Sequence, residues 1–318
     1  MPDPLPFRPD VMEPTPSRSL TRVTSVRWRE RSQLVRALRL WRTRKPTTFG
    51  DKVRYKMLRD RRALVVTFAD KAAVREHVAA AVGDHYLPRA YAVVADPEAL
   101  RGIDLPESYV VKPIHGSGAA IVVSPAADRG ARLPSEPNSW VYCHVHPEHA
   151  PREDVIAIAA GWVRQLYGQG PNREWVYGRV PRQVIVEELL AGADGAIPDD
   201  YKFFVYHGKC HFVQVDSGRF ARRTQDFFTA DWEHLPLTGG LPWARPEPRR
   251  PARLHEMVDV AERLGVDTDF VRVDLYDVDG RIVFGELTSF PAGGDSPFDP
   301  ESFNADFGRP WTVPRRYR

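Results

Sequence analysis

The stretch FVRVDLYDVDGRIVFGELTS, residues 270–289, constrains the fold most, because it has the pattern of a β-hairpin. Two runs rich in β-branched and aromatic residues flank Asp277-Val278-Asp279-Gly280, a sequence typical of a tight turn. Side chains of a strand alternate between its two faces, so the apolar and the charged positions separate. One face then carries Arg272, Asp274 and Tyr276, and on the return run Ile282, Phe284, Glu286 and Thr288 share a side.

The length of the hairpin loop decides whether the acids Asp274 and Glu286 meet. A two-residue turn of Asp279 and Gly280 would set Asp274 opposite Gly285 and send the two acids to opposite faces. A loop with an odd number of residues makes them neighbours, and this is the arrangement that we predict. Adjacent like charges repel unless a cation lies between them or one acid is protonated. We therefore hypothesise a divalent metal site.

Composition places the chain among globular proteins. Its 318 residues are 42% hydrophobic and 27% charged, which argues against a disordered or fibrous chain. Two cysteines, Cys143 and Cys210, provide no disulfide framework and fit a reducing compartment. No apolar run approaches the roughly 20 residues that span a bilayer, and the first 25 residues lack the apolar core of a signal peptide. We expect a cytoplasmic protein.

The charge is distributed unevenly along the chain. Residues 1–62 carry 17 Lys and Arg against 6 Asp and Glu, although the whole chain has a net charge of only +3. Residues 1–18 are rich in proline and read as a flexible arm, and residues 26–44 have the apolar spacing of a basic amphipathic helix. Such a helix either contacts a membrane surface or another polyanion, or docks on its own protein with solvated arginines. Nucleic acid is not expected, because no aromatic platform for bases accompanies the charge.

Helical and β patterns alternate irregularly over the rest of the chain. Helical patterns cover residues 70–82, 154–167 and 252–264; β patterns cover residues 90–94, 109–111, 120–123, 184–190, 201–206 and 211–215, followed by the hairpin. This order favours an α+β fold with mainly antiparallel sheets over a regular parallel one.

A lysine and a glycine-rich turn adjoin each other in VVKPIHGSGAAIVVS, residues 110–124. A lysine on a buried strand is costly unless it meets an anion. The turn Gly116-Ser117-Gly118 lets backbone N–H groups approach phosphate oxygens. Together with Lys112 it forms either a phosphate clamp or an ordinary hairpin with a surface lysine; neither the P-loop nor the dinucleotide fingerprint occurs.

Two further segments contain candidate binding residues. In residues 184–209 an apolar strand runs into Glu187, Glu188, Leu189 and Leu190, whose backbone could meet an adenine edge, and Asp194 could bind ribose hydroxyls. In residues 142–149 Cys143 and three histidines lie close together, but their spacing fits no known zinc pattern, so metal binding there is the less favoured interpretation.

The order of these features resembles the ATP-grasp superfamily, and within it the TupA-like branch named for teichuronopeptide biosynthesis. The resemblance covers roughly residues 49–300 and rests on six motifs in sequence: DKAAVREHV, LPESYVVKPIHGSG, EWVYGRVPRQVIVEELL, DDYKFFVYHGK, RTQDFFTADWEHLPL and VRVDLYDVDGRIVFGELTSFPAGG. It implies two α+β subdomains that clamp ATP, preceded by the basic N-terminal extension. The implied division is 1–48 for the extension, 49–105 for the N-terminal part, 106–192 for the lid and 193–318 for the core with the metal site.

The resemblance also implies roles for single residues. Those that would hold ATP are Lys71, Lys112, Gly116, Ser117, Gly118, Glu187, Glu188, Leu189, Leu190, Asp194 and Lys202. Lys202 and Arg272 would act on the transferred phosphoryl group, while Asp274, Glu286 and Thr288 would hold Mg²⁺. Thr288 stands where the wider superfamily has an asparagine, which is a stronger ligand. Arg219, Arg222 and Arg223 are candidates for binding a substrate carboxylate, or form an exposed basic loop.

The implied activity is an ATP-dependent carboxylate–amine ligase that forms an amide through an acyl phosphate. Small-molecule or glycan-linked carboxylates and amines would be its substrates, in cell-surface polysaccharide or peptide natural-product biosynthesis. Two alternatives stay open: a non-catalytic nucleotide-binding partner of a glycan-assembly complex, and an ATP-dependent kinase of a hydroxyl acceptor.

Overall fold

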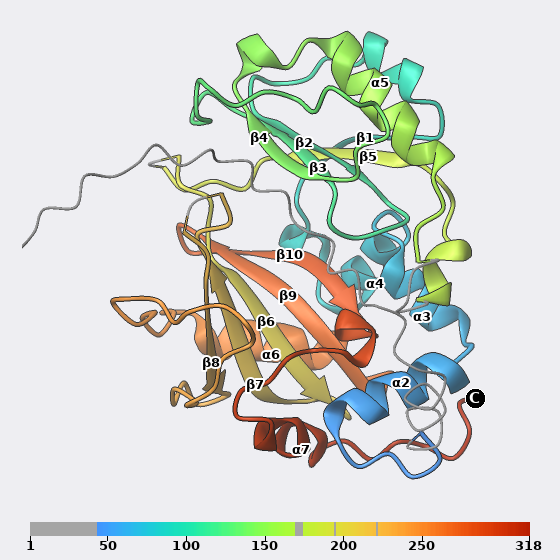
Figure 1. The fold of residues 1–318 in the computed structure, drawn as a ribbon, viewed down its shortest axis with the longest axis vertical. Coiled ribbons are helices and arrows are strands. Elements are labelled where there is room, and N and C mark those ends of the chain that lie inside the picture. The colour runs from blue at the N-terminus through green and yellow to red at the C-terminus, as the bar shows by residue number, and fades with distance from the viewer. Residues whose placement is uncertain (1–42, 169–173, 194, 221) are drawn as a thin grey trace, which may run out of the picture.

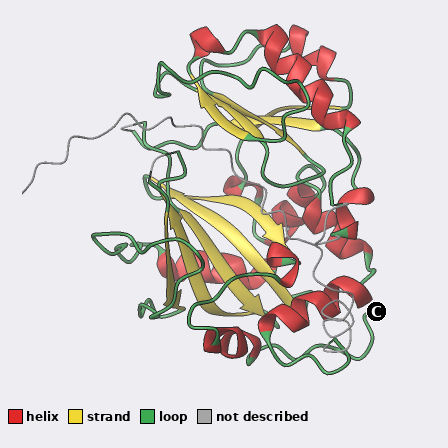
Figure 2. Ribbon diagram, in the orientation of Figure 1, coloured by secondary structure: helices red, strands yellow, loops and turns green. Residues whose placement is uncertain are grey.

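Two five-stranded sheets face each other across the molecule (Figure 1). The computed structural model describes residues 43–168, 174–193, 195–220 and 222–318. The predicted N-terminal helix of residues 26–44 and the ribose candidate Asp194 lie outside the described residues, apart from residues 43 and 44. The α+β prediction is confirmed, because helices surround the two sheets (Figure 2) and all but one of the strand pairs within the described ranges are antiparallel.

Sheet A is the smaller sheet, at the top of Figure 1. Its strands, in spatial order, are β1 (Ala90–Val94), β5 (Val184–Glu188), β2 (Tyr109–Pro113), β3 (Ala120–Val123) and β4 (Tyr142–Val145). Only β3 and β4 run parallel. Because β1 pairs with β5, sheet A begins at Ala90, before the predicted boundary at residue 106. The helix α5 (Arg152–Arg164) covers its outer face and buries Trp162 completely.

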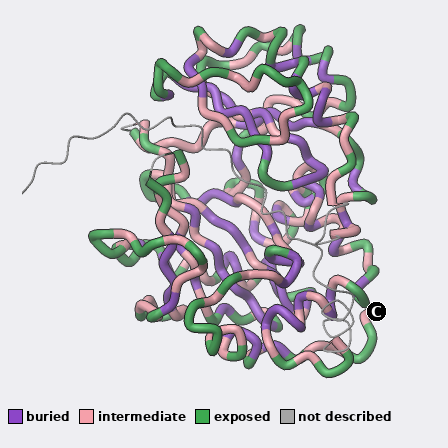
Figure 3. The backbone as a smooth tube through the Cα atoms, in the orientation of Figure 1, coloured by how far each residue is buried: buried purple, intermediate pink, exposed green. Residues whose placement is uncertain are grey.

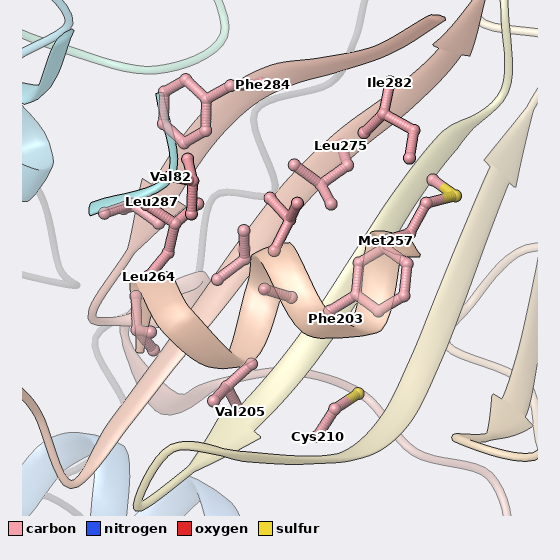
Figure 4. Packing of buried hydrophobic residues seen from close by; sticks show 14 of the residues in the cluster. Val82, Phe203, Val205, Cys210, Met257, Leu264, Leu275, Ile282, Phe284 and Leu287 are labelled. Atoms are coloured by element: carbon pink, nitrogen blue, oxygen red, sulfur yellow. The ribbon is translucent and has the colours of Figure 1, made fainter. Parts of the chain in front are cut away.

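Sheet B is entirely antiparallel. Its strands, in spatial order, are β10 (Arg281–Thr288), β9 (Phe270–Val278), β6 (Asp200–Tyr206), β7 (Lys209–Ser217) and β8 (Thr224–Thr229). Alternate residues of β6 and β9, among them Phe203 and Leu275, pack against Met257 and Leu264 of α6 (Leu254–Leu264) (Figure 4). Burying this face leaves Lys202 and Asp274 on the opposite face, toward sheet A.

The remaining helices lie along the edge and the lower end of sheet B, except Pro97–Gly102, which packs on α5 and β1, and Pro147–His149, which follows β4 of sheet A. They are α2 (Phe49–Arg59), α3 (Ala63–Ala69), α4 (Val74–Ala81) and α7 (Ser302–Gly308), together with the 3₁₀ helices η1 (Asp84–Tyr86), η2 (Pro97–Gly102), η3 (Pro147–His149), η4 (Trp175–Gly178) and η5 (Pro291–Gly294). Thr48 caps α2 by accepting from the Asp51 N–H at 3.3 Å. Phe49 begins α2 and is fully buried among the rings of Phe204, Phe270 and Trp311. Figure 3 shows that buried residues also run along both sheets, where they form separate clusters.

The predicted helix of residues 70–82 begins later than expected. Asp70 does act as a cap, since its Oδ1 accepts from the N–H groups of Ala72 and Ala73 at 2.9 and 3.0 Å. The three residues after it form a turn, so regular helix starts only at Val74. None of the helices in the described ranges combines the length and the hydropathy needed to cross a bilayer.

The register of the hairpin contradicts the predicted odd loop but confirms that Asp274 and Glu286 are neighbours. Arg281 pairs with Val278, so the loop is the two-residue turn Asp279-Gly280, and the prediction of an odd loop is wrong. Asp274 nevertheless faces Glu286, because the register shifts between Phe284 and Glu286. This β-bulge at Gly285 also separates side chains that we expected on one face: Ile282 and Leu287 join the core, Glu286 lies at the pocket, and Phe284 belongs to the core and also lines the pocket.

Candidate functional site

A pocket of about 410 Å³ lies between the two sheets. Its size is typical of sites for small molecules. Most of the predicted site residues line it: Lys71, Lys112, Gly116, Ser117, Gly118, Glu187, Glu188, Leu189, Leu190, Lys202, Arg219, Arg223, Arg272, Asp274 and Glu286. Arg222 and Thr288 do not, although Thr288 contacts two residues that do. The fold therefore brings residues from positions 71 to 286 to one cavity.

The glycine-rich turn connects β2 to β3 and forms one wall of the pocket. Gly118 adopts a φ of +81°, which favours glycine. The Lys71 Nζ donates to the Gly116 carbonyl oxygen. Burial lowers the pKa of Lys71 to about 8, with a smaller opposing effect of the Glu286 charge. The turn and one lysine predicted for the phosphates are thus in direct contact.

Lys112 and Glu187 form an ion pair inside the pocket. Glu187 is 4% exposed and also accepts from Arg75 Nη1 at 2.9 Å. Burial acts to lower the pKa of Lys112, but the charge and hydrogen bond of Glu187, together with the charges of Tyr142 and Glu286, outweigh burial and raise that pKa. Lys112 therefore remains an ammonium, oriented by a carboxylate that was expected at the adenine instead.

The segment after β5 forms the opposite end of the pocket. The Glu188 carboxylate is turned outward, where it accepts from Arg281 Nη2 and from the Arg89 N–H at 2.8 Å each. Leu189 and Leu190 follow, outside the ladder of sheet A, and line the pocket together with the apolar side chains of Val110, Val122, Ile197 and Phe284. Apolar walls of this kind suit a flat heterocycle.

Lys202 lies in a cage of carboxylates. Its Nζ contacts Asp200, and lies 2.9 Å from Asp274 Oδ2 and 3.8 Å from Asp216 Oδ2. Burial acts to lower the pKa of Lys202, but the charges of these acids outweigh burial and raise that pKa overall. The cage arises from the register, because β6 pairs Lys202 with Asp274 on β9 and Asp200 with Asp216 on β7.

Arg272 lies between the two acids of the hairpin. Its Nη2 donates to Asp274 Oδ2 at 2.7 Å, to Glu286 Oε1 at 2.9 Å and to Thr288 Oγ1 at 3.1 Å. Its Nε donates to Asp274 Oδ1 at 2.7 Å. In this structure the guanidinium itself is the cation that offsets the repulsion between the carboxylates.

The two acids differ in the direction of their pKa shifts. Burial acts to raise the pKa of Glu286, but Arg272, Lys71 and Lys202 outweigh it and lower the pKa to about 2. Burial raises the pKa of Asp274 to about 6, against the opposing charges of Arg272 and Lys202. Both groups are therefore ionised at neutral pH, and the Glu286 side chain is 36% exposed toward the cleft.

The donor atoms at this position fit a magnesium ion. Mg²⁺ prefers oxygen ligands and usually takes one or two protein carboxylates together with phosphates and water. Both hydrogen bonds of Glu286 within the described part of the chain use Oε1, which leaves Oε2 for a further partner. Asp274 shares its oxygens with Arg272 and Lys202, so Glu286 is the more available ligand.

The three arginines after β7 behave differently. Arg219 contacts Asp200 and donates to Tyr142 Oη at 3.1 Å, which connects sheet B to β4 of sheet A. Arg223 lines the pocket and has no ion pair among the described residues. Arg222 is exposed. Of the three, Arg223 is thus the one that a substrate carboxylate could pair with.

The Cys and His segment around β4 forms structural contacts. His144 Nε2 lies 2.7 Å from Ser124 Oγ, His146 Nδ1 accepts from the Glu148 N–H at 3.3 Å, and Cys143 packs against the Ala120 carbonyl. Within the described ranges no group of three or more His, Cys, Asp and Glu side chains is arranged to hold a metal ion.

One pocket residue, Asp200, and one titratable residue outside the pocket lining, Glu174, were not predicted. Asp200 is 2% exposed and lines the pocket, and its Oδ1 has no hydrogen-bond partner in the described part of the chain. Burial, followed by the charge of Glu286, raises the pKa of Glu174 to about 7, while Arg272 opposes the shift. Asp200 could have been found as the residue two positions before Lys202, on the same face of β6; Glu174 carries no local signal.

Comparison with known proteins identifies the family. The model of the TupA-like ATP-grasp family matches residues 152–310, which is half of the chain. No curated protein matches. Among solved structures the chain is similar to the ATP-grasp ligase PsnB in complex with a minimal precursor, with 13% identity, a TM-score of 0.37, and coverage of 77% of this chain and 62% of PsnB.

Two further solved structures are similar at the same level. The D-alanine–D-alanine ligase from Bacillus anthracis in complex with ATP has 13% identity and a TM-score of 0.39, covering 78% of this chain and 64% of the ligase. The L-amino acid ligase from Bacillus licheniformis has 13% identity and a TM-score of 0.39, covering 72% and 45%. The chain thus spans less than two thirds of the length of each of these proteins. By the match over residues 152–310, the chain belongs to the TupA-like ATP-grasp family and has the ATP-grasp fold.

Proposed function

We propose that the protein is an ATP-dependent carboxylate–amine ligase. The observation that carries this proposal is the pocket between the sheets, where a glycine-rich turn, four cationic side chains and two facing carboxylates converge. The cations are Lys71, Lys112, Lys202 and Arg272, and the carboxylates are Asp274 and Glu286. A triphosphate needs this combination, because its charge must be neutralised from several directions.

We assign the adenosine to the end of the pocket beside β5. Leu189 and Leu190 would offer backbone groups to the adenine edge, between Val110, Val122 and Phe284. The free oxygen of Asp200 is suited to a ribose hydroxyl, in addition to or in place of Asp194. The phosphates would then extend toward Lys71, Lys112 and the turn of residues 116–118, and the reacting end would lie at Arg272.

Mg²⁺ would be held by Glu286 and Asp274, with Thr288 as a weaker oxygen ligand. When bound, the ion neutralises phosphate charge and orients the terminal phosphate. Arg272 would pair with the transferred phosphoryl group, and Lys202 would orient Asp274. Arg223 is placed to bind the substrate carboxylate.

The reaction would need no covalent residue. A carboxylate oxygen of the substrate attacks the γ-phosphorus, and the bond from that phosphorus to the β–γ bridging oxygen breaks, which yields an acyl phosphate and ADP. An amine then attacks the acyl carbon, loses a proton and displaces phosphate to give the amide. The rate acceleration would come from positioning the reactants and neutralising the charge of the phosphates. The substrates are small or glycan-linked carboxylates and amines.

Product analysis tests the proposal. The full chain is incubated with ATP, Mg²⁺ and a pool of amino acids and sugar acids, and phosphate release is measured together with mass spectra of the products. A ligase yields ADP, phosphate and a new mass equal to the sum of two substrates minus water. A phosphorylated product would instead establish the kinase, and nucleotide binding without turnover on any pool would favour the non-catalytic partner.

A further inference from the structure

An aromatic pair outside the pocket holds the glycine-rich turn from behind. Trp140 precedes β4 and Tyr167 follows α5, so the two rings come from distant parts of sheet A and its covering helix. The rings stack with centroids 5.1 Å apart and an interplanar angle of 24°. Neither ring lines the pocket, and both contact the turn that does.

The contacts between the rings and the turn are close. A Cβ on Gly116 would overlap the Trp140 ring and lie 2.8 Å from Tyr167 Cγ, so only glycine fits beneath the pair. Trp140 Nε1 donates to the Ser117 carbonyl oxygen at 2.7 Å. Burial raises the pKa of Tyr167, and hydrogen bonds with Ser117 partly offset that rise. Packing and hydrogen bonding therefore act on the same two residues of the turn.

The pair is itself fixed by its surroundings. His115 packs edge-on against Trp140 with centroids 5.5 Å apart, and Tyr177 packs edge-on against Tyr167 at 4.9 Å. Behind them, Trp162 is fully buried and donates from Nε1 to the Ser139 carbonyl at 2.8 Å, one residue before Trp140. A clamp anchored in this way cannot follow the turn if the turn moves, so it sets the position of the turn.

We propose that Trp140 and Tyr167 are positioning residues for nucleotide binding, which hold the turn of residues 116–118 where its N–H groups meet the phosphates. Lys71 contacts the same turn from the pocket side, at the Gly116 carbonyl. The turn thus lies between Lys71, which lines the pocket, and the rings of Trp140 and Tyr167, which do not. This inference rests on the proposed function, because it assigns the turn to the phosphates of ATP.

Binding measurements on substituted full-length protein test the inference. Titration calorimetry with Mg²⁺ and a non-hydrolysable ATP analogue is performed on the wild type, Trp140→Phe and Trp140→Leu. Trp140→Leu removes the stack and the donor, so its Kd should rise by about tenfold, equivalent to about 1.4 kcal/mol. Trp140→Phe keeps a ring and loses only the donor, so it should recover part of that loss.

Trp243 provides a matched control. It is 37% exposed, lies outside the pocket and donates from Nε1 to the Leu237 carbonyl at 2.8 Å, so it makes the same type of hydrogen bond. Trp243→Leu should leave the Kd unchanged while its melting temperature shifts as much as that of Trp140→Leu. If Trp140→Leu bound the analogue with wild-type affinity, the inference would be overturned, but the proposed function would stand. If the wild type did not bind the analogue, the proposed function would fail, and the inference with it.

A double-mutant cycle gives a second test. Gly116→Ala alone should weaken binding, because the new Cβ collides with the rings and displaces the turn. In the Trp140→Leu background part of that space is free, so the double variant should lose less affinity than the product of the two single losses. Losses that multiply fully would show that the ring does not set the position of the turn.

Discussion

Replacing Glu286 by alanine should separate activity from stability. The side chain is 36% exposed, and within the described part of the chain its hydrogen bonds run only to Arg272 and Thr288. After the substitution Arg272 keeps both of its bonds to Asp274, so its buried charge still has a carboxylate partner. Partly exposed ion pairs contribute little, and we expect the free energy of unfolding to fall by about 1 kcal/mol or less.

Lys202→Met provides the contrast. Lys202 is 6% exposed and lies among three aspartates, of which Asp200 and Asp274 are 2% exposed. Removing its charge leaves buried carboxylates only partly compensated, by Arg219 and Arg272. The loss in the free energy of unfolding should be about 3–5 kcal/mol.

Urea denaturation followed by circular dichroism measures both changes, and ADP release measures turnover on the same samples. Glu286→Ala should unfold close to the wild type and show no turnover above background. Wild-type turnover in this variant would refute the assignment of Glu286 to the reacting phosphates. A loss of stability as large as that of Lys202→Met would show that Glu286 serves the fold instead.

Three further predictions follow from the charged groups. Burial lowers the pKa of Lys71 to about 8, so affinity for the ATP analogue should fall as pH rises above 8, by at most about tenfold per pH unit; Lys71→Arg should remove this dependence in calorimetric titrations from pH 7 to 9. The folded-state pKa of Glu174 is raised to about 7 from 4.5, so its contribution to stability is present at low pH and is lost as pH rises from about 4.5 through 7; urea denaturation at pH 5 and pH 8 should show a smaller decline for Glu174→Gln. Lys56 is fully buried between Asp60 and Asp269, so Lys56→Met should lose about 3 kcal/mol in the same denaturation assay, and a loss below about 1 kcal/mol would contradict the account of this cluster.

Local patterns predicted the described strands except β4 and β8, and most of the polar positions of the site. Alternation in β9 correctly separated Arg272 and Asp274 from Val273 and Leu275, because one face packs on α6 and the other faces sheet A. The facing of Asp274 and Glu286 was also correct, but for the wrong reason. The register is set by a bulge at Gly285, where a Cβ would lie 2.8 Å from the Tyr276 ring, and that contact cannot be read from the hairpin sequence alone.

Contacts between distant segments could not be predicted. The cage around Lys202 depends on pairing of β6 with both β7 and β9, and the stack of Trp140 on Tyr167 joins two loops that no periodicity relates. The buried aromatic cluster around Phe49 likewise needs the C-terminal Trp311. These features follow from tertiary packing, and local sequence patterns contain no information about it.

A crystal structure of the full chain with Mg²⁺ and a non-hydrolysable ATP analogue tests the central claim most directly. The account predicts adenine beside Leu189 and Leu190, phosphates at Lys71, Lys112 and the turn of residues 116–118, and a metal ion bound by Glu286 and Asp274 at the terminal phosphate. A nucleotide bound outside the pocket between the sheets, or a metal ion that neither carboxylate contacts, would contradict it.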